Sequence, residues 1–283
     1  MDIIKNRKIY YGISLGIIIL GLIMWMVNGL NYGIDFTGGT SIQIKIGQVI
    51  SVDEAREIVD DYDKEASILH IGSNQDEIMI RSKKDFTSQE INEIVEKFQE
   101  KYNISEKEFQ SEKFGPFMGK EIRKKALLSS LIAALFMLIY ISWRFELKFA
   151  IAAILALAQD VLITLSIYAI FKIPINSAFI AAILTILGYS INDTIVIFDR
   201  IREETRLNPK SDAGDIINLS IKKSITRTIN TTLTTLVAVV LLYIVGVEDV
   251  KILALPLIFG IISGTYSSLF IASPLWYEMT SKS

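Results

Sequence analysis

Cysteine is absent from the 283 residues, and histidine occurs once, at His70. The absence of thiols excludes disulfide bonds and cysteine-based metal or redox sites. A single histidine with no set of ligands around it is far more often structural than metal-binding, so we assign His70 no role. The net charge of −2 gives no basic field that would attract nucleic acid. We therefore expect no metal, no organic cofactor and no nucleic-acid partner.

Sequence patterns of the common enzyme classes are also missing. The chain has no G-x-S-x-G, no H-E-x-x-H and no dinucleotide-binding glycine pattern. Residues 115–120 superficially resemble a phosphate loop, but the spacing is one residue short and Glu121 takes the place of the metal-binding hydroxyl. We expect a protein that is not an enzyme, in which any energy from ATP comes through another protein.

Charge is nearly absent from six long apolar stretches, which are residues 9–27, 126–143, 149–171, 176–198, 228–245 and 252–276. Each approaches or exceeds the roughly 18–20 residues needed to cross the hydrocarbon layer of a membrane. A charge there costs about 2.5–3.5 kcal/mol, which explains the segregation. The sequence predicts six transmembrane helices. The first is longer than a signal-peptide core and lacks a small-residue cleavage site, so we interpret it as a retained anchor.

Basic residues indicate the orientation of these helices. They occur in residues 5–8, in the turn 143–148 and in the loop 200–227, which all fall on one side of the membrane. Positive charge in short loops collects on the cytoplasmic side, so both termini are expected in the cytoplasm of a multi-pass cytoplasmic-membrane protein. The basic residues 123–125 lie on the other side, but long translocated domains largely escape this rule.

Between the first two spans the pattern changes to that of a small α+β domain. Residues 41–46 alternate as a strand, and capping-box spacings at Ser51 and Thr87 each predict the start of a helix. Residues 68–71 and 78–80 flank the polar turn 73–76 and predict a hairpin.

A last strand is expected near Phe109, which gives the order β-α-β-β-α-β of a ferredoxin-like fold. We expect an N-terminal tail and first span at 1–31, this extracytoplasmic domain at 32–120, and a five-span helical bundle at 121–283.

Two carboxylic acids occur inside apolar spans, where ionisable residues are functional candidates. Asp193 lies in the fourth span next to Asn192, and Arg227 enters the fifth span near the same depth. Asp160 lies near the centre of the third span, beside Gln159.

These acids allow two interpretations. Hydrocarbon favours the neutral form of a carboxyl group and a nearby guanidinium favours the charged form, so Asp193 between them can carry a proton or relay an ion. Alternatively, Asp193 and Arg227 form a static pair that holds two helices together. Asp160 either belongs to the path or pairs with Gln159 and a neighbouring helix.

Small residues spaced four apart predict helix packing. Gly12 and Gly16 follow this spacing in the first span, and Gly260, Gly264 and Ser268 follow it in the sixth. We expect helix association at these faces, within the chain or between chains.

Four segments together resemble a known family. Residues 33–40 read Gly-Ile-Asp-Phe-Thr-Gly-Gly-Thr and include Gly33, Asp35, Phe36, Gly38 and Gly39. With residues 114–116, 188–203 and 227–231, they resemble the SecF type of the SecD/SecF protein-export membrane proteins, which are related to the RND transporters.

The resemblance implies half of a twelve-helix RND-type unit, paired with a SecD-like protein and acting beside the SecYEG channel on a translocating preprotein. It implies coupling to the proton-motive force, with H⁺ or in some relatives Na⁺ as the ion. The matching motif positions place Asp193 and Arg227 in the proton pathway, with Asn192 beside Asp193. Asp160 lies outside the matching segments, and the resemblance does not carry it over in the same way. Two rivals remain: an RND-type exporter of small molecules or lipids, and a passive scaffold of the channel.

Overall fold

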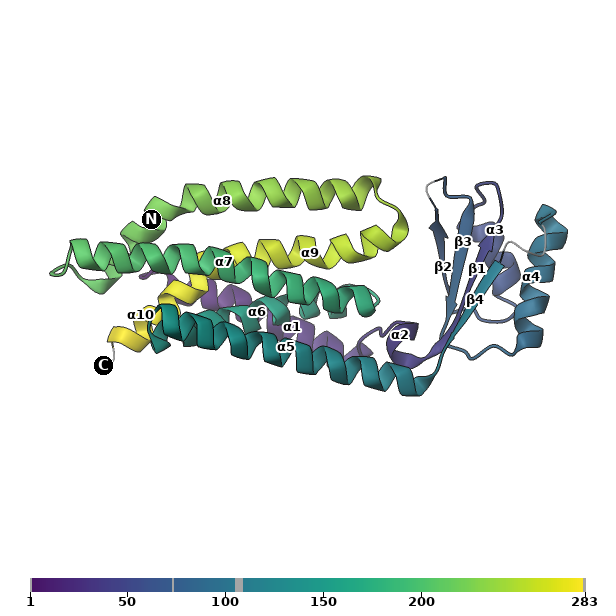
Figure 1. Cartoon of the computed structure of the whole chain (residues 1–283), viewed down its shortest axis with the longest axis horizontal. Coiled ribbons are helices and arrows are strands. Elements are labelled where there is room, and N and C mark those ends of the chain that lie inside the picture. The colour runs from purple at the N-terminus through teal and green to yellow at the C-terminus, as the bar shows by residue number, and fades with distance from the viewer. Residues whose placement is uncertain (1, 73, 105–108, 282–283) are drawn as a thin grey trace.

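A bundle of long helices carries a small sheet domain at one end (Figure 1). The computed structural model describes residues 2–72, 74–104 and 109–281. The two ends of the described chain lie together at the other end of the bundle, away from the sheet (Figure 1). The predicted architecture of a membrane helical bundle with a small α+β domain is confirmed.

Six helices of the described chain are long and apolar enough to cross a membrane, as predicted. They are α1 (Arg7–Asn28), α5 (Pro116–Arg144), α6 (Leu147–Phe171), α7 (Ser177–Leu207), α8 (Ala213–Val245), and a sixth span formed by α9 (Glu248–Ser267), the π-helical turn η1 (Ser268–Ala272) and α10 (Ser273–Ser281). α6, α7 and the sixth span bury much of their surface in the bundle, whereas α1, α5 and α8 leave most of theirs exposed. The outer helices thus provide the surface for lipid or for other membrane helices.

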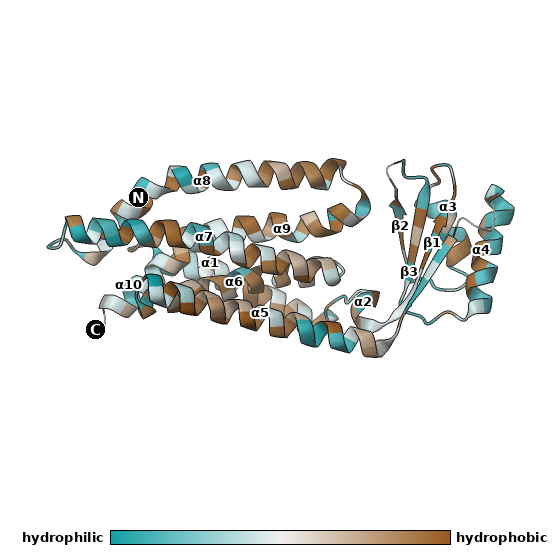
Figure 2. Cartoon of the chain, in the orientation of Figure 1, coloured by the Kyte–Doolittle hydropathy of each residue, from teal (hydrophilic) through white to brown (hydrophobic). Residues whose placement is uncertain are grey.

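Three helices are longer than their predicted spans. α5 begins ahead of the apolar stretch, and α7 and α8 extend together beyond the apolar part at the end away from the sheet. Figure 2 shows hydrophilic residues at these helix ends. In the α7–α8 extension, Glu204 is 1% exposed and pairs with Arg200 at 2.7 Å and with Lys223 at 2.6 Å. Two cations therefore compensate this buried carboxylate and join the two extensions.

Glycines set the close packing of the inner helices. A Cβ on Gly260 would lie 2.1 Å from Ile186, and one on Gly264 would lie 2.8 Å from Ser190, so the predicted small-residue face of the sixth span packs against α7. Gly12 and Gly16 meet no atom within 4 Å of an added Cβ in the described chain. In α1 it is Gly21 that packs closely, against Ser166 of α6.

The sheet domain between α1 and α5 has the predicted strand and helix order. It contains β1 (Gly39–Lys45), α3 (Val52–Val59), β2 (Ser67–Ile71), β3 (Glu77–Ser82), α4 (Ser88–Tyr102) and β4 (Phe109–Phe114). The strands form one antiparallel sheet in the order β2-β3-β1-β4, which is the ferredoxin-like arrangement. The β2–β3 hairpin is confirmed, although Ser73 of its predicted turn lies outside the described residues.

Local sequence signals account for the domain's two helices. Ser51 and Thr87 each accept a hydrogen bond in a complete capping box, as predicted. Both helices pack on one face of the sheet, where the core includes Ile42, Ile80 and Phe98. The other face of the sheet is left without a helical layer of its own and turns toward the bundle (Figure 1).

Candidate functional site

Asp160 lies at the centre of the bundle with no exposed surface. Its carboxylate accepts three hydrogen bonds from serine hydroxyl groups: Ser190 of α7 at 2.6 Å, Ser263 of α9 at 2.7 Å and Ser267 of α9 at 2.8 Å. The three donors satisfy both carboxylate oxygens, so Asp160 ties α6, α7 and α9 together at one level.

The alternative in which Asp160 pairs with Gln159 and a neighbouring helix holds for the neighbouring helices, but Gln159 does not join Asp160. The side chain of Gln159 is 8% exposed, and neither atom of its amide has a hydrogen-bond partner in the described part of the chain. The serines bind Asp160 because consecutive residues of a helix point in different directions, and only Asp160 faces α7 and α9.

Asp193 lies on α7 one turn beyond Ser190 and is 3% exposed. Its Oδ2 atom is buried and has no hydrogen-bond partner within the described ranges. Hydroxyl groups line the neighbouring helices, where Thr232 of α8 and Thr265 of α9 share a hydrogen bond of 2.8 Å. A buried carboxylate oxygen without a partner is costly as an anion, and it is available to a proton.

Arg227 and Asn192 lie on the outer surface of the bundle, since both are exposed. No ion pair within 4.0 Å joins Arg227 to Asp193 among the residues with described positions. Their helices meet one turn away, where the Tyr189 hydroxyl group donates a hydrogen bond of 3.1 Å to the carbonyl oxygen of Thr231. The predicted static Asp193–Arg227 pair is therefore not formed in this structure. A polar group exposed to the hydrocarbon layer must reach the membrane interface or find polar neighbours.

His70 has a structural contact. Its Nε2 atom lies 2.6 Å from the carbonyl oxygen of Ile50, which holds β2 against the segment before α3. The described residues contain no group of three or more His, Cys, Asp or Glu side chains that could hold a metal ion.

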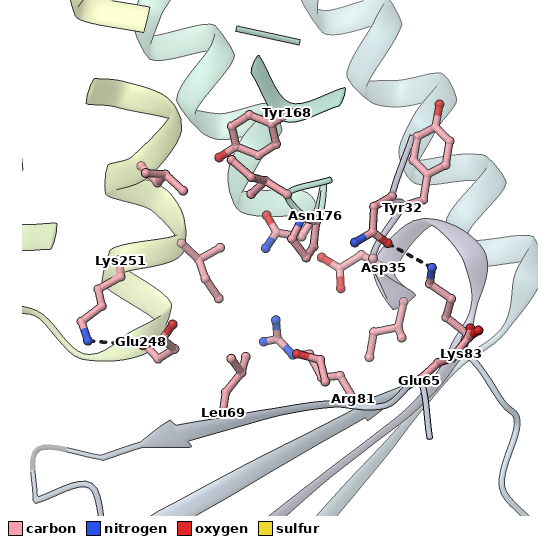
Figure 3. A pocket seen from close by; sticks show the side chains of 18 of the residues that line it. Tyr32, Asp35, Glu65, Leu69, Arg81, Lys83, Tyr168, Asn176, Glu248 and Lys251 are labelled. Carbon is pink, nitrogen blue, oxygen red and sulfur yellow. Dashed lines mark hydrogen bonds and ion pairs between the residues drawn. The ribbon is translucent and has the colours of Figure 1, made fainter. Parts of the chain in front are cut away.

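A second region of interest lies between the bundle and the sheet, where a cavity of about 290 Å³ opens. Tyr168 and Asn176 reach it from the helix ends, while Leu69 and Arg81 reach it from the sheet (Figure 3). Asp35 lines the same cavity, so part of the signature segment lies where the two parts of the chain meet (Figure 3).

The signature segment forms the short helix α2 (Ile34–Thr37) between α1 and β1. Phe36 is 2% exposed and packs with Tyr168, Phe179 and other apolar residues at the outer end of the bundle. Gly38 and Gly39 follow with φ values of 82° and 143°, a backbone region that favours glycine. At Gly39 a Cβ would also lie 2.1 Å from the carbonyl oxygen of Ser82, so the turn into β1 leaves no room for a side chain.

Two family models match the chain. The model described as "Protein export membrane protein SecD/SecF, C-terminal" matches residues 93–282, and "SecD/SecF GG Motif" matches residues 23–48. The chain belongs to the SecD/SecF family of protein-export membrane proteins. The second match contains the signature segment, which confirms the resemblance seen in the sequence.

Relatives extend the match over the whole chain. The protein translocase subunit SecF of Calditerrivibrio nitroreducens is 39% identical over 99% of this chain and 94% of its own length. That of Alicyclobacillus acidocaldarius is 34% identical over 100% of this chain and 94% of its own. The chain is accordingly an auxiliary subunit of the Sec protein translocase.

Longer relatives match this chain over one part of their own length. The protein translocase subunit SecDF of Bacillus subtilis is 35% identical over 97% of this chain, which covers 37% of that protein. The crystal structure of SecDF from Thermus thermophilus has a TM-score of 0.85 and 31% identity, with 99% of this chain covering 39% of that one. A SecDF structure in a super-membrane-facing form gives a TM-score of 0.74 at 30% identity, with 100% and 39% covered. The chain thus spans about two fifths of the SecDF chains.

Sequence reasoning missed several residues of this architecture. Ser263 and Ser267 bind Asp160 from α9, and their spacing of four residues on one helix face was the available signal. Glu204 follows Arg200 at the same spacing and was equally readable as a pair. Nothing local to Asp35 indicates its contact with α7.

Proposed function

We propose that this subunit works with a SecD-like partner and uses the proton-motive force to promote translocation of preproteins through the SecYEG channel. Asp193 exchanges the proton. The observation that supports this role is its buried Oδ2 atom, which has no hydrogen-bond partner in the described part of the chain and lies one turn from Ser190. The protein acts without enzymatic chemistry and without a cofactor, and H⁺ is the coupling ion.

Asp193 suits proton exchange better than Asp160 does. The carboxylate of Asp160 accepts hydrogen bonds from three hydroxyl groups, and such bonds stabilise its charged form. Asp193 has an oxygen that can take a proton without breaking any of those bonds. Asp160 then serves the pathway by fixing the position of α7.

A partner helix completes the site on the outer face. Asn192 and Arg227 are exposed on α7 and α8, beside Asp193 in depth. SecDF relatives carry about three fifths of additional chain in the same polypeptide, which supports a SecD-like partner for this chain. In a twelve-helix RND-type unit, helices of that partner cover this face and bring polar groups to Arg227 and Asn192.

Both termini lie in the cytoplasm in this proposal, and residues 32–120 form the extracytoplasmic domain between an anchor at 1–31 and the bundle at 121–283. The membrane potential acts on a charge crossing this bundle with about 2.3 kcal/mol per 100 mV. An energy of that size biases a two-state motion of the domain by more than tenfold.

Export into inverted membrane vesicles tests the proposal. With ATP and the channel present, we expect Asp193→Asn to insert normally and to abolish the stimulation of preprotein export by the proton-motive force. Asp199→Asn is the matched control, because Asp199 lies on the same helix but is exposed and paired with Arg144. Stimulation of wild-type size in Asp193→Asn contradicts the proposal.

A passive scaffold is the second candidate, and the serine-bound Asp160 is the observation that favours it. For a scaffold, Asp193→Asn lowers assembly with the partner and leaves the export per assembled complex unchanged. Measuring the amount of complex beside the export rate separates the two functions.

A further inference from the structure

The chain at the start of the signature segment forms two backbone hydrogen bonds with Ile175, just ahead of α7. Gly33 N–H donates to the carbonyl oxygen of Ile175 at 2.7 Å, and Ile175 N–H donates to that of Asn31 at 2.8 Å. Tyr32 and Ile175 form a parallel β-bridge. The chain just before α2 is therefore joined to the chain just before α7 at Ile175.

Asp35 adds a side-chain cap to α7. Its Oδ2 atom accepts a hydrogen bond of 2.8 Å from the backbone N–H of Ser177, the first residue of α7. Asn176 caps the same helix locally, by accepting from Phe179 N–H at 3.0 Å. The first N–H groups of a helix lack partners within it, and the helix dipole favours a negative charge there. The second cap comes from a residue 142 positions away.

α2 also packs closely against α5. A Cβ on Gly119 of α5 would lie 2.3 Å from the carbonyl oxygen of Phe36, so α2 rests directly on the α5 backbone. β1 follows after Gly38 and Gly39 and lies in the middle of the sheet, between β3 and β4. A displacement of α2 is therefore passed to the centre of the external domain rather than to its edge.

α7 connects the contact between Asp35 and Ser177 with the proton-exchange residue Asp193. The helix contains no proline between Ser177 and Leu207, and Asp193 lies about 24 Å from its capped end at 1.5 Å per residue. A movement of α7 on protonation of Asp193 reaches Ser177 without an intervening break.

We infer that Asp35 is a positioning residue that couples α7 to the external domain, with the signature segment acting as a clamp that stays docked on α7. This rests on the proposed function, in which α7 carries the proton-exchange residue. Asp35 takes no part in proton transfer itself. Its loss is therefore expected to separate proton movement from export.

The test uses the full chain with its SecD-like partner, in vesicles for export and in proteoliposomes for proton flux. For Asp35→Ala we expect proton flux within twofold of wild type and at least a fivefold loss of stimulated export. Asp35→Asn keeps an acceptor oxygen, so its stimulated export is expected to lie between that of Asp35→Ala and that of the wild type. Lys251→Ala, which alters the opposite side of the same cavity, is the control and retains coupling. Unchanged export in Asp35→Ala, or an equal loss in Lys251→Ala, overturns the inference.

A cross-link supplies a measurement that does not depend on the Asp35 variants. Because the natural chain has no cysteine, Tyr32→Cys with Ile175→Cys places one pair across the β-bridge, at a separation that suits a disulfide. A clamp that stays docked predicts equal export by the oxidised and the reduced protein. Export that is lost on oxidation and restored by reduction shows instead a hinge that must open.

Failure of the inference and failure of the proposed function give different patterns. If Asp193→Asn keeps wild-type flux and export, the proposed function fails, whatever Asp35 does. If Asp193→Asn abolishes both while Asp35→Ala also abolishes flux, Asp35 supports the bundle and the coupling role is wrong.

Discussion

The hydroxyl group of Ser190 donates a hydrogen bond of 2.6 Å to the carboxylate of Asp160, across the contact between α6 and α7. Ser190 also meets Gly264 of α9, where a Cβ would lie 2.8 Å from the serine Cβ. Three helices are thus fixed at one point, a single turn away from Asp193. The position of Asp193 depends on this contact.

Removing the Asp160 carboxylate is expected to loosen the bundle. Asp160→Ala leaves three buried hydroxyl groups without their acceptor, and three interhelical hydrogen bonds in membrane proteins amount to about 2 kcal/mol. Asp160→Asn keeps an acceptor oxygen, so its loss of stability should be less than half that of Asp160→Ala. Unfolding of purified protein in detergent measures the difference, with the exposed Asp199→Ala as the control. An Asp160→Ala protein as stable as wild type contradicts the structural role.

Gly264→Ala tests the same junction from α9. The added methyl group must displace Ser190, and overpacking of this kind costs about 1–3 kcal/mol. Gly16→Ala is the matched control, since its Cβ would meet no atom within 4 Å in the described chain. We expect a lower unfolding temperature for Gly264→Ala alone. Equal unfolding temperatures for the two variants would show that α7 and α9 pack less closely than described.

The stability of the first turn of α4 should depend on pH. Glu90 accepts hydrogen bonds from the backbone N–H of Thr87 at 2.7 Å and from its hydroxyl group at 2.8 Å, and these bonds lower the pKa of Glu90 below its ordinary value of 4.5. A lowered pKa means that the stabilisation is present above the ordinary value and disappears as pH falls through the folded-state value.

Hydrogen exchange at the first amides of α4 measures this effect. After correction for intrinsic rates, we expect protection in the wild type to fall between about pH 6 and pH 3. Glu90→Gln keeps an acceptor without a titrating group, so its protection should not change in that range. A pH-dependent loss of the same size in Glu90→Gln would assign the effect to another group.

The sequence was sufficient for the features that depend on neighbouring residues. Apolar runs located the six spans, and the capping boxes at Ser51 and Thr87 located the two helix starts of the sheet domain. These signals are local, because each depends on residues within one helix or strand.

The contacts of the site were beyond the sequence because they join distant segments. Asp160 binds Ser267 across 107 residues, and Asp35 binds Ser177 across 142. Depth in the membrane follows from counting residues, but the direction of a side chain depends on helix packing. Arg227 shows the difference: counting residues predicts its depth, but the exposure of its side chain is known only from the structure.

Proton flux through reconstituted protein tests the role of Asp193 most directly. In proteoliposomes that contain this chain and its SecD-like partner, an imposed membrane potential should drive proton uptake by the wild type and by Asp199→Asn. Asp193→Asn should lower the rate by at least tenfold while the amount of assembled complex stays unchanged. Uptake at the wild-type rate in assembled Asp193→Asn would show that this carboxyl group does not carry the proton.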